Sequence, residues 1–468
     1  MGRPVVANLL RDTWGWAAPR WIETVLHCPI ASGASEDPAR GQFKGTWFVR
    51  FRGRWVIGAV VVAVAASSSI VAFSASDGLG AKSTVTTGRA PLLTGPGWRV
   101  TENVAGKVGP VADRRWLAGG TVPGAGSTWA EMVRYALVDL RQLTGPNGSV
   151  AAGAGENWGY AWPRDNAFVA AALAKTGHHQ EADLILQFLQ AAQENDGGFE
   201  ARYLLSADRS PDSRTRQSDG AGWVLWALDE VASSSSDRHA TATRFRAMLD
   251  SATAFSLSLV GDGTRLPAPS PDYWERRESQ LTLGTAAPLL TGLWASARLY
   301  QDLGERTAAT RSRSAADGLE HLITRSFEPG GYQRYELTGG ADAAICFLMP
   351  PFNDRPSASV VAAWERYQVD AARPAGGLAP GVSWKQDGIS WTPETALVAY
   401  TAAASGRPQN ATRWLNWLDA HRTDWDSLPE KVLADGAPAG PAPLAWTAAS
   451  VVLAAAALQE QPTRQQNP

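Results

Sequence analysis

The sequence predicts an all-α protein in which two layers of helices close into a ring, behind an N-terminal apolar segment. Apolar residues recur at helical spacing through most of the chain after Ser127, and runs that alternate apolar and polar residues are few and short. Long loops that carry Trp, Asp, Glu and Arg separate the helical segments. A solenoid of helix pairs would show a similar pattern, but the loops have no fixed period, which favours a closed single domain.

The first element is a run of 19 residues without a charge, Trp55–Phe73, which follows three arginines within residues 50–54. Its length and basic flank predict a transmembrane or signal-anchor helix over 55–75, with the basic side in the cytoplasm and the remainder outside. Small residues at 72–76 leave a cleaved signal peptide as the alternative. Either alternative exports the protein, which would then be anchored in the cell membrane with an extracellular domain, or secreted.

The expected organisation has four parts. Residues 1–54 fit neither a leader nor a compact domain, and they form a short cytoplasmic segment or result from a wrongly assigned start. The helix over 55–75 is followed by a Gly-, Pro-, Ser- and Thr-rich linker over 76–127. Residues 128–468 form the helical domain.

The helical domain contains about eleven segments with the helical pattern. They span residues 129–143, 166–177, 181–193, 220–232, 241–259, 281–304, 306–327, 357–370, 392–405, 411–422 and 444–460. Several are apolar on more than one face, which predicts that they lie in an inner layer.

Composition narrows the class of ligand. The 468 residues include 43 Lys+Arg and 45 Asp+Glu, net −2, so no overall field attracts nucleic acid, and a neutral ligand is expected. Neither Cys28 nor Cys346 belongs to a Cys/His cluster with metal-ligand spacing, so no disulfide framework, zinc site or cofactor is expected. A monomer is expected. The 21 Trp suggest that many of them line a site instead of the core.

The stretch "WGYAWPRDNAF" places Trp158, Tyr160 and Trp162 directly before Arg164 and Asp165. Asp165 is expected to cap the following helix, and a capped helix whose Arg pairs with another acid is the plain alternative. Trp and Tyr faces stack on sugar rings, whereas Arg and Asp bind adjacent hydroxyls. The combination therefore predicts the floor of a sugar-binding pocket.

Other loops contribute acids. Gln217 and Asp219 precede one helix and could serve only as cap and loop polar groups.

In "SPDYWERRE", Glu275 directly follows Trp274. An apolar ring beside a carboxyl group partly shields that group from water, which favours the protonated form that a general acid needs. Glu430, in "LPEKVLADG", could be a surface residue, but its loop should lie at the same end of the ring as the loop of Glu275. Two carboxylates that face each other across a sugar are what glycoside hydrolysis requires.

Five segments in order resemble glycoside hydrolase family 15, the glucoamylase and glucodextranase family, over about residues 127–460. They are "TGPNGSVAAGAGENWGYAWPRDNAFVAAAL", "RQSDGAGWVLWAL", "PDYWE", "DAAICFLMPPF" and "LPEKVLADG…LAWTAA". The resemblance implies an (α/α)6 toroid. It also implies an exo-acting, inverting hydrolase that releases a sugar, expected to be glucose, from the non-reducing end of an oligosaccharide or polysaccharide.

The same resemblance implies roles for single residues. Glu275 matches the general acid, Glu430 matches the general base, and Arg164 with Asp165 matches the pair that holds the terminal hydroxyls. Substrate-binding residues are expected to be Trp158, Tyr160, Trp162, Arg164, Asp165, Gln217, Asp219, Trp274 and Lys385.

The chain also departs from the family pattern. Lys385 is the nearest cation where the family has a substrate-binding Arg, and Lys cannot reproduce its bidentate fork. Arg276 replaces a second acid, and 76–127 is too short for the β-sandwich of bacterial relatives. Alternatives that stay open are a non-catalytic glycan-binding envelope protein on the same fold, a trehalase or other α-glucoside hydrolase, and a lyase or phosphorylase.

Overall fold

The chain forms two structural units, Met1–Lys82 and Ser83–Pro468, which are described separately. The computed structural model describes residues 42–51, 54–63, 111–155, 157–206 and 208–465.

In the first unit, the described residues form a β-hairpin of β1 (Gln42–Phe51) and β2 (Arg54–Ala63), paired antiparallel. The helix predicted over 55–75 is therefore wrong for residues 55–63, and its remainder lies outside the described residues. The run is rich in Val and Ile, whose β-branched side chains suit extended backbone, and hydropathy alone does not distinguish the two conformations. Among the described residues, no helix combines the length and the apolar character that crossing a bilayer requires.

The second unit contains a closed inner ring of six elements, each in contact with the next. The last contacts the first, so a solenoid is excluded. The ring consists of α5 (Pro163–Lys175), α7 (Gly220–Ser234), α10 (Leu283–Asp302), the 3-10 helix η2 (Ala343–Leu348), α13 (Thr392–Ala404) and α15 (Ala445–Gln465). Most residues of α5, α7, α10 and α13 are buried, as expected for helices that are apolar on several faces.

An outer layer alternates with this ring along the chain. It consists of α4 (Ala130–Leu143), α6 (His179–Ala192), α8 (Arg238–Arg244) with α9 (Arg246–Val260), α11 (Arg306–Phe327), α12 (Ala358–Asp370) and α14 (Pro408–Ala420). The predicted two-layered ring of helices is thus confirmed, except that a short 3-10 helix takes the fourth inner position. Two details differ from expectation: α3 (Val111–Ala118) lies within the predicted linker and packs on α4, and the segment predicted as one helix over 241–259 breaks at Phe245.

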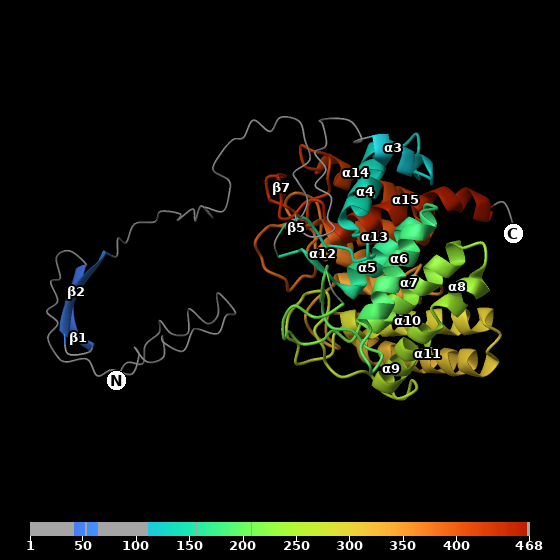
Figure 1. Cartoon of the computed structure of the whole chain (residues 1–468), viewed down its shortest axis with the longest axis horizontal. Coiled ribbons are helices and arrows are strands. Elements are labelled where there is room, and N and C mark those ends of the chain that lie inside the picture. The colour runs from blue at the N-terminus through green and yellow to red at the C-terminus, as the bar shows by residue number, and fades with distance from the viewer. Residues whose placement is uncertain (1–41, 52–53, 64–110, 156, 207, 466–468) are drawn as a thin grey trace. The chain divides into compact units, whose positions relative to one another are not determined.

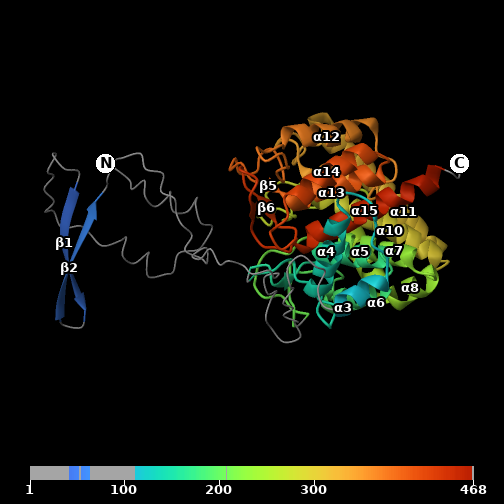
Figure 2. The same ribbon diagram turned by 90° about the horizontal axis from the view of Figure 1, so that it is seen from above.

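The alternation makes the inner helices parallel, because each outer helix returns the chain to the same end of the ring. Figures 1 and 2 both place β5 (Ser390–Trp391) at one end of this unit and α8 near the other. Short strands join the loops at the first end: β3 (Tyr160–Ala161) pairs with β4 (Tyr203–Leu204), and β5 pairs with β6 (Lys431–Val432), which pairs with β7 (Pro438–Ala439). The N-termini of the inner helices, with their partial positive charge, therefore meet at the end that carries the loops.

Aromatic side chains fill the centre of the ring. The ring of Phe168 lies 4.8 Å from Trp226, and that of Phe352 lies 5.3 Å from Trp226. Trp223 and Trp226 are fully buried, as are Trp364 and Trp414. These four of the 21 tryptophans therefore belong to the core.

Candidate active site

The first turn of α5 brings two of the predicted residues together. Pro163 occupies the first helical position and Trp162 is the N-cap, without a side-chain cap bond. Asp165 therefore does not cap the helix as expected. It lies in the first turn, where the helix dipole favours a carboxylate, and it accepts a hydrogen bond of 3.0 Å from Nη2 of Arg164.

Arg164 is the cation at the centre of the site. Its guanidinium is buried, stacks 4.6 Å from the ring centroid of Trp446, and lies 3.7 Å from Oε1 of Glu275. Burial opposes the charge, but the carboxylates of Asp165, Glu275 and Asp219 outweigh it and raise the pKa of the Arg164 guanidinium. Its Nε and Nη1 groups have no hydrogen-bond partner in the described protein, so they can donate to a bound hydroxyl.

Glu275 lies in the loop before α10 in a conformation that is rare for a residue with a side chain. Its φ is +55°, and such left-handed backbone outside glycine is concentrated at functional sites. The carboxylate accepts a hydrogen bond of 2.8 Å from Nε2 of Gln217 and lies 3.2 Å from Nη1 of Arg214. The turn thus directs the carboxylate toward Arg164 and the loop before α7.

The environment of Glu275 differs from the expected apolar shield. Trp274 packs with its ring centroid 3.6 Å from the guanidinium carbon of Arg334 and 4.8 Å from the ring of Trp384. The Glu275 carboxylate contacts the cationic groups of Arg164 and Arg214 and the amide of Gln217. The left-handed backbone explains the difference, because it sends these neighbouring side chains in different directions.

Arg334, which was not predicted from the sequence, stabilises the loop that carries Glu275. It is 1% exposed and forms ion pairs with Asp272 at 2.9 Å, Glu278 at 2.7 Å and Asp342 at 3.3 Å. Asp272 and Glu278 flank Glu275 on both sides, so one buried guanidinium holds both ends of the turn. Arg334 lies about sixty residues further along the chain, and no local pattern in the sequence identifies this role.

Glu430 enters from the loop before α15 and is buried, at 7% exposure. Its N–H donates to the carbonyl of Pro441, and its own carbonyl accepts from the N–H of Thr392 at the start of α13. A Cβ at Gly440, where φ is +75°, would lie 2.9 Å from Oε2 of Glu430, so this position requires glycine. The loop is therefore built closely around the carboxylate.

The charge of Glu430 is set by opposing effects. Burial raises its pKa above the ordinary value, whereas Lys431, whose Nζ lies 2.8 Å from Oε2, and the side chain of Trp158 favour the ionised form. The net pKa is raised.

Two further buried acids surround Arg164. Burial raises the pKa of Asp219 to about 7 against the attraction of Arg164, and one oxygen of Asp219 accepts 3.0 Å from Nε1 of Trp223 without capping α7. Glu394, in the first turn of α13, was not predicted. Its pKa is raised to about 8, chiefly by burial and also by Glu430, while a backbone hydrogen bond and Arg164 act in the opposite direction. Glu394 thus couples electrostatically to Arg164 and to Glu430, which links the surroundings of the two proposed catalytic acids.

Comparisons with known proteins point to one family of enzymes. The family model described as "Glycosyl hydrolases family 15" matches residues 127–230. An isomaltose glucohydrolase of Kribbella flavida is 27% identical over 316 residues, which cover 58% of this chain and 75% of that protein. The chain is a glycoside hydrolase that resembles glycosyl hydrolases family 15.

Solved structures share the fold of this chain at low identity. A variant glycosidase in complex with glucose has a TM-score of 0.61 and 19% identity, and the match covers 70% of this chain and 96% of that one. A bacterial glucoamylase complexed with acarbose has a TM-score of 0.61 and 15% identity, covering 74% of this chain and 57% of that one. These neighbours support the (α/α)6 architecture.

The predicted aromatic residues lie directly before the start of α5. The guanidinium carbon of Arg202 stacks 4.0 Å from the ring of Tyr160 and 5.3 Å from the ring of Trp162. Trp158 interacts with Glu430. Lys385, in contrast, is exposed, with its Nζ 5.9 Å from the ring of Trp384 and no ion pair among the described residues. Of the predicted binding residues, Lys385 has the weakest structural support.

Several indoles around this end of the ring supply donors. Their Nε1 atoms are buried and have no hydrogen-bond partner among the described residues. These tryptophans are Trp162, Trp274, Trp384, Trp391 and Trp446. Since buried donors are nearly always paired, they suit a ligand with many hydroxyl groups.

We expect Arg334→Met to lower the free energy of unfolding by about 3–5 kcal/mol, because it leaves three buried carboxylates without their cation. Denaturant unfolding measures the change. Arg311→Met is the matched control, since its pair with Asp262 is exposed and should contribute about 1 kcal/mol or less. Equal effects of both substitutions would contradict the anchoring role of Arg334.

We expect Lys431→Met to move the acidic limb of the pH profile of kcat/KM to higher pH. The Lys431 ammonium lowers the pKa of Glu430, so its removal raises that pKa and leaves Glu430 protonated over a wider range. The control is Arg313→Met, an exposed cation on α11, which should leave the limb unchanged. A shift toward lower pH would contradict the assignment of this limb to Glu430.

Proposed function

We propose that the protein is an exo-acting, inverting glycoside hydrolase that releases glucose from the non-reducing end of an α-linked glucan or oligosaccharide. One observation carries the proposal. Glu275, from the loop before α10, lies 3.7 Å from Arg164, and Glu394 couples electrostatically to both Arg164 and Glu430. Glu275 and Glu394 thus adjoin one buried guanidinium, and the electrostatic interaction of Glu394 with Glu430 supports placing the second carboxylate on the other side of the same site, as hydrolysis across a sugar ring requires.

In the proposed reaction, Glu275 protonates the glycosidic oxygen while Glu430 removes a proton from a water that attacks the anomeric carbon from the opposite face. Arg164, Arg214 and Gln217 stabilise the carboxylate that Glu275 becomes after it gives up its proton. Lys431 and Trp158 favour the ionised form of Glu430, which a general base must have.

Sugar binding is proposed for the groups around this pair. The buried N–H groups of Arg164 donate to hydroxyls of the terminal ring, and Asp165 accepts from them. A protonated Glu394 adds a donor near neutral pH, because its pKa is about 8. The indoles of Trp162 and Trp446 offer faces for stacking and buried N–H donors.

The substrate class rests on the relatives. The isomaltose glucohydrolase of Kribbella flavida is named for an α-linked glucose disaccharide, and the structural neighbours include complexes with glucose and with acarbose. We therefore propose α-glucosides as substrates, and isomaltose, maltose, starch fragments and trehalose form the panel to test.

The test follows the anomeric form of the first sugar released, by ¹H NMR, with the full chain and each member of the panel. Inversion predicts that the glucose from the non-reducing end appears first as the β anomer, whereas the leaving sugar keeps the anomeric form that it had in the substrate. Release of the non-reducing-end glucose as the α anomer would overturn the inverting mechanism, and sugar phosphate formed only when phosphate is present would identify a phosphorylase. Binding without any turnover across the panel would favour the non-catalytic glycan-binding alternative.

Export is also proposed, on the charge-free run that follows three arginines near the N-terminus. Cell fractionation together with N-terminal sequencing of the mature protein tests it. Activity confined to the cytoplasm would overturn it.

A further inference from the structure

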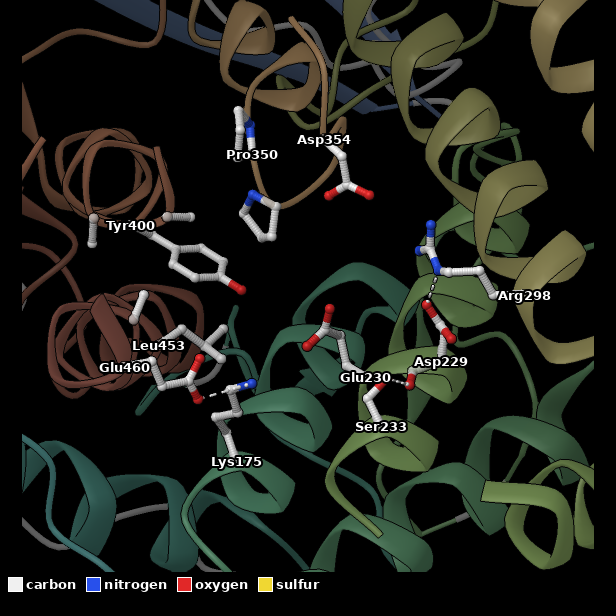
Figure 3. A pocket seen from close by; sticks show the side chains of 14 residues that line it. Lys175, Asp229, Glu230, Ser233, Arg298, Pro350, Asp354, Tyr400, Leu453 and Glu460 are labelled. Atoms are coloured by element: carbon white, nitrogen blue, oxygen red, sulfur yellow. Dashed lines mark hydrogen bonds and ion pairs between the residues drawn. The ribbon is translucent and has the colours of Figure 1, made fainter. Parts of the chain in front are cut away.

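A cavity lies at the opposite end of the inner helices from Glu275 and Glu430. It has a volume of about 210 Å³ and is lined by residues from the C-terminal halves of five inner helices. These include Lys175 on α5, Glu230 on α7, Arg298 on α10, Tyr400 on α13 and Glu460 on α15 (Figure 3). Since Arg164 and Lys175 lie eleven residues apart on α5, the two sites are separated by roughly 16 Å along the helix axis.

The cavity follows from the irregular member of the ring. At the fourth inner position, η2 ends at Leu348, and the chain continues through Pro350, Pro351 and Asp354 as non-helical backbone that lines the cavity. No full-length helix therefore fills this end of the ring. Phe352 packs against Trp226 and Tyr400 in the centre of the ring, which separates the cavity from the catalytic cluster.

The charges that line the cavity are only partly paired. Asp229 forms ion pairs with Arg298 at 2.7 Å and Arg238 at 3.1 Å, and Lys175 pairs with Glu460 at 3.1 Å. Glu230 and Asp354, whose carboxylates face the cavity in Figure 3, have no ion pair among the described residues.

The helix dipoles, like the carboxylates of Glu230 and Asp354, make the cavity electronegative. The inner helices end here, so their partial negative charges also face this end of the ring. The cavity therefore favours a cation.

Tyr400 provides an independent sign of a ligand. The residue is only 4% exposed, yet its hydroxyl points into the cavity (Figure 3) and has no hydrogen-bond partner among the described residues. Burial raises the pKa of this hydroxyl, as do the carboxylates of Glu230 and Glu460, so it stays protonated near neutral pH. A buried hydroxyl that faces a cavity without a protein partner is suited to bind a polar group there.

We propose that this cavity binds a small protonated amine, whose N–H groups donate to the Glu230 carboxylate and the Tyr400 oxygen while Asp354 at the rim adds attraction. An ammonium group with a short carbon chain fits the volume, and its positive charge offsets one of the two unpaired negative charges. A directly bound metal ion fits less well, because the described residues contain no group of three His, Cys, Asp or Glu side chains placed to hold one. The site is independent of the proposed hydrolysis.

The test is calorimetric titration of the full chain with methylammonium chloride at pH 8, against sodium chloride at equal ionic strength. At this pH Glu230 is ionised, because burial raises its pKa only to about 7. We expect one saturable site in the wild type. Affinity should fall at least about tenfold in Glu230→Gln and severalfold in Tyr400→Phe, since each loses a hydrogen bond to the ammonium group.

Matched variants make the outcome specific. Glu365→Gln removes an exposed acid on α12 and should bind as the wild type does, as should Glu275→Gln, and circular dichroism with thermal melting verifies that each variant folds. Absence of saturable binding, or equal affinity in Glu230→Gln, would overturn the proposal. Saturable binding of Mg²⁺ but not of methylammonium would overturn the assignment to an amine, and loss of binding in Glu275→Gln would move the amine to the catalytic cluster.

Discussion

Glu275→Gln is expected to lower kcat on a natural α-glucoside by about 10²- to 10⁴-fold, because an amide cannot give a proton to the glycosidic oxygen. The substitution keeps the size and the hydrogen-bonding position beside Gln217, so the effect should come from the chemistry and not from the fold. Steady-state kinetics on a natural disaccharide, paired with an aryl α-glucoside that has a good leaving group, measures it. The aryl substrate should lose much less rate, since its departure needs little protonation.

Glu336→Gln is the control for this experiment, because Glu336 is an exposed acid and should leave kcat within about twofold. Nearly full activity of Glu275→Gln on the natural substrate would remove Glu275 from the proposed acid role. An equal loss on both substrates would show that Glu275 acts in some step other than protonation of the leaving group.

Glu430→Gln is expected to cause a loss of similar size, about 10²- to 10⁴-fold in kcat, but on both substrates. The general base activates the attacking water, and a good leaving group does not replace that function. Azide should restore turnover of the aryl substrate in this variant, because it attacks without a base, and the product should be the β-glucosyl azide. Product analysis by NMR together with kinetics measures both effects.

The pattern across the two variants separates the roles of the two acids. Rescue by azide in Glu275→Gln but not in Glu430→Gln would reverse the assignment. Formation of the α-glucosyl azide would contradict attack from the face opposite the leaving group.

Much of the helical architecture could be predicted from local patterns in the sequence. Helices such as α11 and α13 begin and end within a residue or two of the predicted segments, because periodic apolar side chains and a Pro or Gly at the boundaries act over short distances. The hairpin of β1 and β2 shows the limit of this reasoning. Hydropathy shows only that residues 55–63 are apolar. Pairing with a second segment decides whether such a run forms a strand or a helix.

In the candidate active site, too, some residues could be predicted from the sequence and others could not. The order Trp–Pro–Arg–Asp and the acids at 275 and 430 were recognisable as sequence patterns. Arg334 and Glu394 were not, since their roles depend on the acids and cations that the ring brings beside them from distant segments. Asp165 was expected to cap its helix, and a cap was the plain alternative for Asp219, but their side chains bond to Arg164 and Trp223.

By itself, the sequence determined that the chain is a two-layered helical protein with a family 15 set of loop residues, because periodicity and short motifs are properties of neighbouring residues. Only the tertiary structure decided which charges meet. Closing the ring placed Arg164 among four acids at one end, and the short η2 left a lined cavity at the other. The physical reason is that burial and electrostatic coupling depend on distances between segments far apart in the chain, and no local pattern encodes those distances.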